Sequence, residues 1–352
     1  MKKLKTVEYI WLDGTKPTGQ IRSKTRIVNL PDHFTINDFP MWNFDGSSTN
    51  QATGQDSDCL LNPVNYVIDG LDNGGDYLVL CEVLNSDKTP HKSNIRSKLR
   101  HALDLGGQQI ELWAGFEQEY TMFRRNIPLG WPEHGFPGKQ GPYYCGVGSE
   151  QIFGRELANK HRQVCLKSGI MYYGMNAEVM PGQWEYQIGY RGCDQEDSSA
   201  LNISDHMWIA RWLMHRLSEE YNIHVSHDNK PVKGDWNGAG MHTNFSTKDS
   251  RSKETGKKAI DSYIKNLERN HEIHVKYYGD KLEERLTGAH ETSPITQFSY
   301  GEANRGSSIR IPRSVADKGY GYIEDRRPGA NADPYIVSYL ILSSILGIKI
   351  DL

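Results

Sequence analysis

The stretch WAGFEQEYTMF at residues 113–123 constrains the fold of this chain more than any other. Its aromatic and apolar residues indicate a strand that is at least partly buried. Glu117 and Glu119 are two positions apart, so on a strand both carboxylates point to one face, about 6.6 Å apart along the backbone. Two unit charges at that distance repel by roughly 2–3 kcal/mol at an effective dielectric constant near 20. Because the strand keeps both glutamates, we expect a positive charge beside them.

Three further segments have the same alternation, with one apolar face and one polar face that carries Glu, His or Arg. They are QWEYQIG at 183–189, GMHTNFS at 240–246 and GYIEDRR at 321–327. Five carboxylates and one imidazole suit Mg²⁺ or Mn²⁺, which prefer carboxylate oxygen. The candidate ligands are Glu117, Glu119, Glu178, Glu185, Glu324 and His242. Alternatively, each glutamate is a solvated surface charge and His242 is a structural histidine, since periodicity does not decide whether the faces converge.

Several arginines follow in the C-terminal third of the chain: Arg285, Arg305, Arg310, Arg326 and Arg327. The planar guanidinium fork suits carboxylates and phosphates. Metal-binding carboxylates beside several arginines favour a phosphoryl-transfer site over a hydrolytic one. The alternative for any one arginine is a surface ion pair.

Charge and length exclude several classes of protein. The 352 residues carry a formal net charge of −3, which does not favour nucleic acid or an anionic membrane as a partner. The five cysteines are far apart, which argues against a zinc ribbon and fits a reducing, cytoplasmic location. Residues 335–350 are apolar but contain three serines, so we expect a buried helix there and no membrane span.

Residues 7–90 read as strands separated by turns, and a helical pattern with Ser93 as a possible cap then ends at Gly106. We therefore expect a domain boundary at Thr89-Pro90, with domains at 1–90 and 91–352. Further helices are expected at about 149–168, 204–221, 257–277 and 334–346. Residues 125–148 form a long Gly/Pro-rich loop, and such loops are usually functional when they are ordered. The small residues at 238–240 and the Asp45-Gly46 pair are by themselves turn signals.

Eight blocks of the chain, in order, resemble glutamine synthetases of the type II class. They are WNFDGSST, GFEQEYT, GWPEHGFPGKQGPYYCGVG, NAEVMPGQWEYQIG, KPVKGDWNGAGMHTNFST, RLTGAHETS, ANRGSSIRIPR and GYIEDRRPGANADPY. The resemblance implies an α+β fold, with an N-terminal β-grasp domain and a catalytic domain of the glutamine synthetase/guanido kinase-like type. In that catalytic domain an antiparallel sheet curves into a half-barrel with helices outside. It also implies a decamer of two pentameric rings in which each active site lies between subunits.

The resemblance implies a role for each matching position. One metal site resembles the set Glu117, His242 and Glu324, and the other resembles the set Glu119, Glu178 and Glu185. Positions that match contacts to glutamate or to the transferring phosphate are Asp235, Trp236, Asn237, Gly238, Arg285, Arg305 and Arg326. Positions that match contacts to ATP and its metals are Glu117, Glu185, Asn244, Phe245, Ser246, Arg305, Arg310, Tyr322, Ile323 and Glu324. Asp45 matches the ammonium-site aspartate, with Ser48 and Tyr144 nearby, and Glu291 matches the glutamate of the flap over the site.

The implied reaction is ATP-dependent ligation of ammonia to L-glutamate with two or more Mg²⁺ or Mn²⁺ ions per site. ATP would phosphorylate the γ-carboxylate, and ammonia would then displace phosphate from γ-glutamyl phosphate. Two other classes remain open: a ligase that joins glutamate to a larger amine, and a non-catalytic or simple metal-binding relative. The intact set of Asp45, Tyr144 and Glu291 favours ammonia over a larger amine, and the arginines argue against a simple metal-binding protein.

Overall fold

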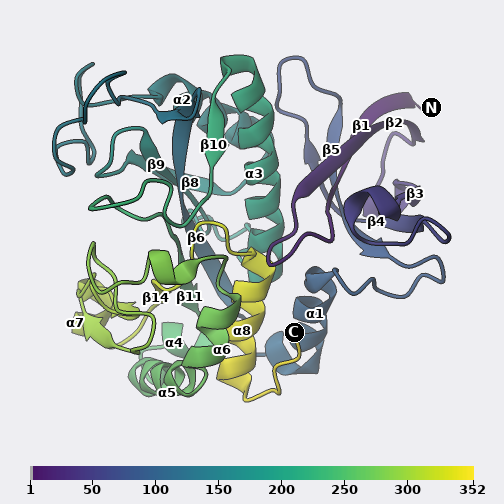
Figure 1. Ribbon diagram of the computed structural model, residues 1–352. Helices are drawn as coiled ribbons and strands as arrows, with labels where there is room; N and C mark the ends of the chain where they lie inside the picture. Colours follow the sequence, from purple (N-terminus) through teal and green to yellow (C-terminus); the bar gives the residue numbers. More distant parts are fainter. Residues whose placement is uncertain (1–2) are drawn as a thin grey trace.

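The computed structural model describes residues 3–352, and its chain forms two β-sheets separated by helices (Figure 1). The N-terminal sheet has five strands in the order β2-β1-β5-β4-β3, and β1 is antiparallel to β2 but parallel to β5. Its strands are β1 Lys3–Leu12, β2 Ile21–Leu30, β3 Trp42–Asp45, β4 Asp58–Ile68 and β5 Tyr77–Leu84.

Alternation along β1 and β5 divides the N-terminal sheet between two cores. Val7, Tyr9 and Trp11 face a core formed within the N-terminal part of the chain. Ile10 and Leu80, on the opposite face, belong to the large core shared with the rest of the molecule. One face of this sheet therefore packs on the C-terminal part, which places the two sheets relative to each other.

The second sheet has nine strands, in the order β12-β13-β14-β11-β6-β9-β8, with β7 and β10 paired to β6. Its pairs are antiparallel except β12 with β13. Its strands are β6 Trp113–Arg124, β7 Ile127–Pro128, β8 Tyr172–Ala177, β9 Gln183–Ile188, β10 His224–Ser226, β11 Met241–Ser246, β12 Tyr300–Glu302, β13 Ile309–Ile311 and β14 Ile323–Asp325. The predicted α+β class with an N-terminal β-grasp sheet is confirmed.

Helix α3 lies between the nine-stranded sheet and the N-terminal sheet, and α8 packs against α3 and α1 (Figure 1). The α-helices are α1 Ile95–Ala102, α2 Arg155–Lys167, α3 Ala200–Tyr221, α4 Lys248–Arg251, α5 Gly256–Arg269, α6 His271–Tyr277, α7 Arg313–Lys318 and α8 Pro334–Leu346. Short 3-10 helices occur at Ile36–Asp38, Gly46–Thr49 and Leu282–Glu284, and a π-turn occurs at Leu103–Gly107. Among residues 3–352, no helix combines the length and the apolar character that a membrane crossing requires.

The predicted helix at 334–346 is confirmed, whereas three other helix predictions need correction. The helix expected from 149 begins at Arg155, after Gly154 in a left-handed conformation. The segment 257–277 is two helices that meet at Asn270. Asn94, and not Ser93, caps α1, because its side chain accepts a hydrogen bond from the backbone N–H of Ser97.

Candidate metal and substrate site

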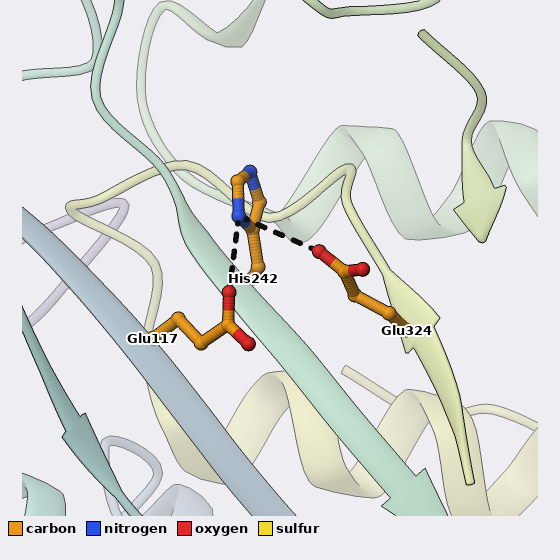
Figure 2. Close-up of side chains that lie close together, drawn as sticks. All are labelled: Glu117, His242 and Glu324. Atoms are coloured by element: carbon orange, nitrogen blue, oxygen red, sulfur yellow. Dashed lines mark ion pairs between the residues drawn. The ribbon is translucent and has the colours of Figure 1, made fainter. Parts of the chain in front are cut away.

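The first candidate metal group lies on three neighbouring strands of the large sheet, β6, β11 and β14. Glu117 pairs with His242 in the β6–β11 register, and Glu324 lies on the next strand. The Nδ1 atom of His242 is 3.6 Å from a Glu117 carboxylate oxygen and 3.7 Å from a Glu324 carboxylate oxygen (Figure 2). Burial, with Arg326 and Arg285 nearby, holds the pKa of His242 well below its usual range, so the ring is neutral and able to act as a ligand.

The second candidate group consists of three buried carboxylates, Glu119 on β6, Glu185 on β9 and Glu178 in the turn before β9. Glu119 and Glu185 are directly opposite each other in the antiparallel register. One oxygen from each of the three side chains lies within 4.8 Å of the others, as do the ligand atoms of the first group. Glu119 also accepts a hydrogen bond from the backbone N–H of Gly240.

The surroundings of the second candidate group strongly disfavour the ionised form of its three carboxyl groups. Burial first, and then the charge of Glu119, raises the pKa of Glu178 to about 8. Burial and the charge of Glu117 raise the pKa of Glu185 well above its usual range. Burial also raises the pKa of Glu119, against the effect of Arg285. Without a cation, this cluster must therefore bind protons to limit the repulsion.

The donor atoms fit two hard divalent cations. The first group offers two carboxylates and an imidazole, and the second group offers three carboxylates. These are the ligands that Mg²⁺ and Mn²⁺ prefer, and two doubly charged ions would offset the negative charge gathered here.

Three arginines surround the carboxylates and are themselves held in place. Arg326 donates to Glu324 at 2.6 Å and to the carbonyl of Arg305 at 2.8 Å. Arg310 donates to the other oxygen of Glu324 at 2.7 Å, while its buried Nε has no protein partner among the described residues. Arg285 donates to the carbonyl of Arg326 at 3.0 Å, and its other Nη lies 2.9 Å from Nε2 of His242.

The small residues at 238–240 make room for Arg285. A Cβ on Gly240 would lie 2.4 Å from a guanidinium nitrogen of Arg285, and a Cβ on Gly238 would lie 2.8 Å from its Cγ. Glycine at these positions allows the arginine to lie directly against the start of β11. Residues 238–240 therefore do more than form the turn that the sequence alone predicts, because they also leave space for Arg285.

Both metal groups open into one cavity of about 560 Å³. The predicted site residues that line it are Glu117, Glu119, Tyr144, Glu178, Glu185, Asn237, Gly238, His242, Arg285, Glu291, Arg305, Arg310, Glu324 and Arg326. Asn244 is also close, because its side-chain N–H donates to Glu117 at 2.7 Å. The structure thus brings together predicted residues from segments that are far apart along the chain.

Other predicted site residues do not line this cavity. Phe245 and Ile323 point into the hydrophobic core, so contacts from their side chains to a nucleotide do not fit this arrangement and only their backbone remains available. Ser246 accepts a hydrogen bond from Arg251, and Tyr322 is 43% exposed. Asp235 and Trp236 lie at the rim, where Asp235 approaches His290 at 3.0 Å and the Trp236 ring packs on Trp131.

Asp45 and Ser48 do not line the cavity of their own chain. Both are exposed: Asp45 is the last residue of β3 in the N-terminal sheet, and Ser48 lies in the 3-10 helix Gly46–Thr49 that follows. The Asp45 carboxylate accepts hydrogen bonds of 2.6 Å from the hydroxyls of Ser47 and Ser48. These hydrogen bonds hold the pKa of Asp45 below its usual range, so it is an anion at neutral pH.

Sequence reasoning missed Gln140 and His290, which connect the long loop to the opposite rim. The Gln140 side chain donates to Nδ1 of His290 at 3.0 Å and accepts from the backbone N–H of Asn237 at 2.8 Å. His290 and Glu291 both have positive φ, at 51° and 58°. The position of His290 beside Glu291 was the available signal, although nothing in the sequence pairs it with Gln140.

Comparison with known proteins gives matches along most of the chain. The family profile described as "Glutamine synthetase, beta-Grasp domain" matches residues 3–86, and "Glutamine synthetase, catalytic domain" matches residues 92–261. A glutamine synthetase of Streptomyces viridochromogenes is 50% identical over 96% of this chain and 95% of its own. Those of Emericella nidulans and Saccharomyces cerevisiae are each 48% identical over 97% of this chain, and over 92% and 88% of their own.

Proposed function

The chain belongs to the glutamine synthetase family, and from this premise we propose how it catalyses the ATP-dependent synthesis of L-glutamine from L-glutamate and ammonia. The observation that carries the proposal is the convergence of six metal-ligand side chains and four arginines on one cavity. A site with both features suits the meeting of two anionic substrates, the phosphates of ATP and the carboxylate of glutamate.

The two acidic groups are assigned to two Mg²⁺ or Mn²⁺ ions. Glu117, His242 and Glu324 hold one, and Glu119, Glu178 and Glu185 hold the other. When bound, the ions supply positive charge that offsets the charge of the phosphates and of the γ-carboxylate. Asn244, Ser246, Tyr322 and the backbone of Phe245 and Ile323 are assigned to ATP.

The arginines stabilise the phosphoryl group during transfer. Arg305, Arg310 and Arg326 line the cavity beside Glu324, and Arg285 lies against Gly238 and Gly240, next to Asn237. Arg285, Asn237, Gly238, Asp235 and Trp236 are assigned to glutamate. The γ-carboxylate oxygen attacks the terminal phosphorus of ATP, and ADP leaves with the electron pair of the broken P–O bond.

Ammonia then attacks the γ-carbonyl carbon of the acyl phosphate, and phosphate leaves. Ammonium has to lose a proton first, and Asp45, an anion at neutral pH, is assigned to bind it and accept that proton, with Ser48 and Tyr144 beside it. Glu291, on the turn that carries positive φ, is assigned to closing the site against water.

Because Asp45 does not line its own chain's cavity, we assign it to the site of a neighbouring subunit in a decamer of two pentameric rings. We also propose a domain division at residue 90 and a cytoplasmic location. The separate core of the N-terminal sheet supports the division.

A turnover assay with wild type and the variants Glu119→Ala and Asp45→Ala tests the proposal. We expect glutamine, ADP and phosphate from glutamate, ATP and ammonium in wild type, and a large loss in both variants with the fold retained. Faster turnover with putrescine than with ammonium would instead support a ligase for larger amines. Near-normal activity in both variants would contradict the assigned roles.

A further inference from the structure

The turn that carries Asp45 is bonded to the segment that connects the two parts of the chain. Gln51, the last buried residue of this turn, has a side chain that donates to the carbonyl of Leu12 at 3.0 Å and to the hydroxyl of Ser93 at 2.8 Å. Its side-chain oxygen accepts from the hydroxyl of Thr49 at 2.8 Å. The turn is therefore tied to a residue 42 positions further along the chain, and not only to its neighbours in the sheet.

A closed ring of hydrogen bonds joins Gln51, Ser93 and His91. The backbone N–H of Ser93 donates to Nδ1 of His91 at 3.1 Å, so this nitrogen is an acceptor and Nε2 carries the proton. Nε2 donates to the backbone carbonyl of Gln51 at 2.8 Å, and the Ser93 hydroxyl lies 2.8 Å from Nδ1. Burial lowers the pKa of His91, which agrees with a neutral ring. Each member of the ring therefore has a defined donor or acceptor role.

Arg96, in the first turn of α1 directly after this segment, joins it to the rest of the molecule. Its guanidinium donates to both oxygens of Asp205 on α3, at 2.8 and 2.9 Å, and to Glu82 on β5 at 2.8 Å. Asp205 also accepts from Tyr335 on α8 at 2.6 Å and from Asn65 on β4 at 3.0 Å. Arg96, Asp205 and Glu82 are all buried, so the geometry of this cluster is fixed.

We propose that Gln51, His91, Ser93 and Arg96, together the linker network, are positioning residues for ammonium binding, because they hold the Asp45 turn in a fixed place relative to α3 and α8. The inference rests on the proposed function, in which Asp45 acts in the site of a neighbouring subunit. The carboxylate of Asp45 is exposed on its own chain, so its position at that site depends on how rigidly its turn is attached. A shift of about 1 Å in such a group costs up to about 10²-fold in rate.

Ser93→Ala is the mildest test, because it removes the hydroxyl that joins Gln51 to His91 and leaves the charged cluster intact. We expect the KM for ammonium to rise about three- to tenfold, with the KM values for glutamate and ATP within about twofold of wild type. We also expect faster hydrogen–deuterium exchange of amides 46–52. Ser97→Ala is the matched control, because the Ser97 hydroxyl bonds only to the carbonyl of Asn94 among the described residues, outside the ring.

Arg96→Lys tests the second half of the network, because lysine keeps the charge but loses the paired geometry toward Asp205 and Glu82. The same selective rise in ammonium KM is expected, with an unchanged subunit number by mass photometry. An unchanged ammonium KM in Ser93→Ala, or an equal loss for all three substrates, would overturn the inference. Unchanged amide exchange would overturn it even without an activity measurement. If Asp45→Asn retains full glutamine synthesis, the proposed role of Asp45 fails separately.

Discussion

At the residue scale, the site gathers carboxylates that repel one another in the absence of a cation. Glu185 is the clearest case, since burial and three neighbouring glutamates act together to raise its pKa. Its one side-chain donor is Gln187, within the described residues. A glutamine at 185 keeps the shape, removes the charge and is able to turn its amide to suit Gln187. The substitution therefore tests the effect of the charge with little change in side-chain shape.

We therefore predict that Glu185→Gln raises the thermal midpoint of the metal-free protein and weakens binding of Mn²⁺ at least about tenfold. The physical reason is that the variant loses a buried, repelled carboxyl together with a metal ligand. Differential scanning fluorimetry with and without Mn²⁺ measures both effects. Glu254→Gln, at an exposed position on the surface, is the control and should leave both values unchanged. A metal-induced stabilisation equal to that of wild type would contradict the role of Glu185.

The raised pKa of Glu178, about 8 against an ordinary 4.5, gives a pH dependence of defined sign. Between these two values the folded protein binds more protons than the unfolded chain. The corresponding contribution to stability is fully present below pH 4.5 and is lost as the pH rises through about 8. Metal binding requires the ionised form, so it releases protons near neutral pH.

We predict that Mn²⁺ binding at pH 7 releases protons from the wild-type protein and fewer from Glu178→Gln. Isothermal titration calorimetry in buffers of different ionisation enthalpy measures the number released. Equal proton release from both proteins would show that Glu178 does not carry the effect.

At the element scale, strand β11 depends on the glycines that precede it. A methyl group at 240 would enter the space of the Arg285 guanidinium, which is buried and bonded to the carbonyl of Arg326. We predict that Gly240→Ala displaces Arg285 and raises the KM for glutamate about tenfold, with a smaller effect on the KM for ATP. Steady-state kinetics for both substrates test this. Gly54→Ala, where a Cβ meets nothing within 4 Å, is the matched control.

The sequence predicts which segments of the site are strands, but it does not predict which of these strands lie next to one another. Alternation along FEQEYTMF, QWEYQIG and GMHTNFS placed Glu117, Glu119, Glu185 and His242 on polar faces, and the structure brings these faces together. Periodicity alone did not give that convergence, because it depends on strand order, and the resemblance to a family supplied it. The Gln140–His290 contact has no periodic signal at all, since both residues lie outside the regular strands and helices.

At the scale of the whole molecule, the described chain keeps Asp45 away from its own cavity, which is the kind of site in which we propose that Asp45 acts. One face of the N-terminal sheet packs on the catalytic part, and the linker network holds the Asp45 turn on that sheet. A movement of Asp45 into its own cavity would have to break both sets of contacts. If each site is shared between two subunits, Asp45 does not have to move into its own cavity. A test with two inactive proteins follows from this arrangement.

We predict that Asp45→Asn and Glu119→Gln, each nearly inactive alone, regain activity when co-expressed in equal amounts. A site then works when a Glu119→Gln subunit donates its intact Asp45 to the intact cavity of an Asp45→Asn neighbour, so random mixing restores about one quarter of the sites. Differently tagged subunits and native mass spectrometry verify mixing, and glutamine formation per subunit measures recovery. Co-expression of Glu119→Gln with Glu178→Gln is the control, because both changes lie in the same cavity and every site then lacks a ligand. Recovery in the control as well, or in neither mixture, would contradict a site that is shared between subunits.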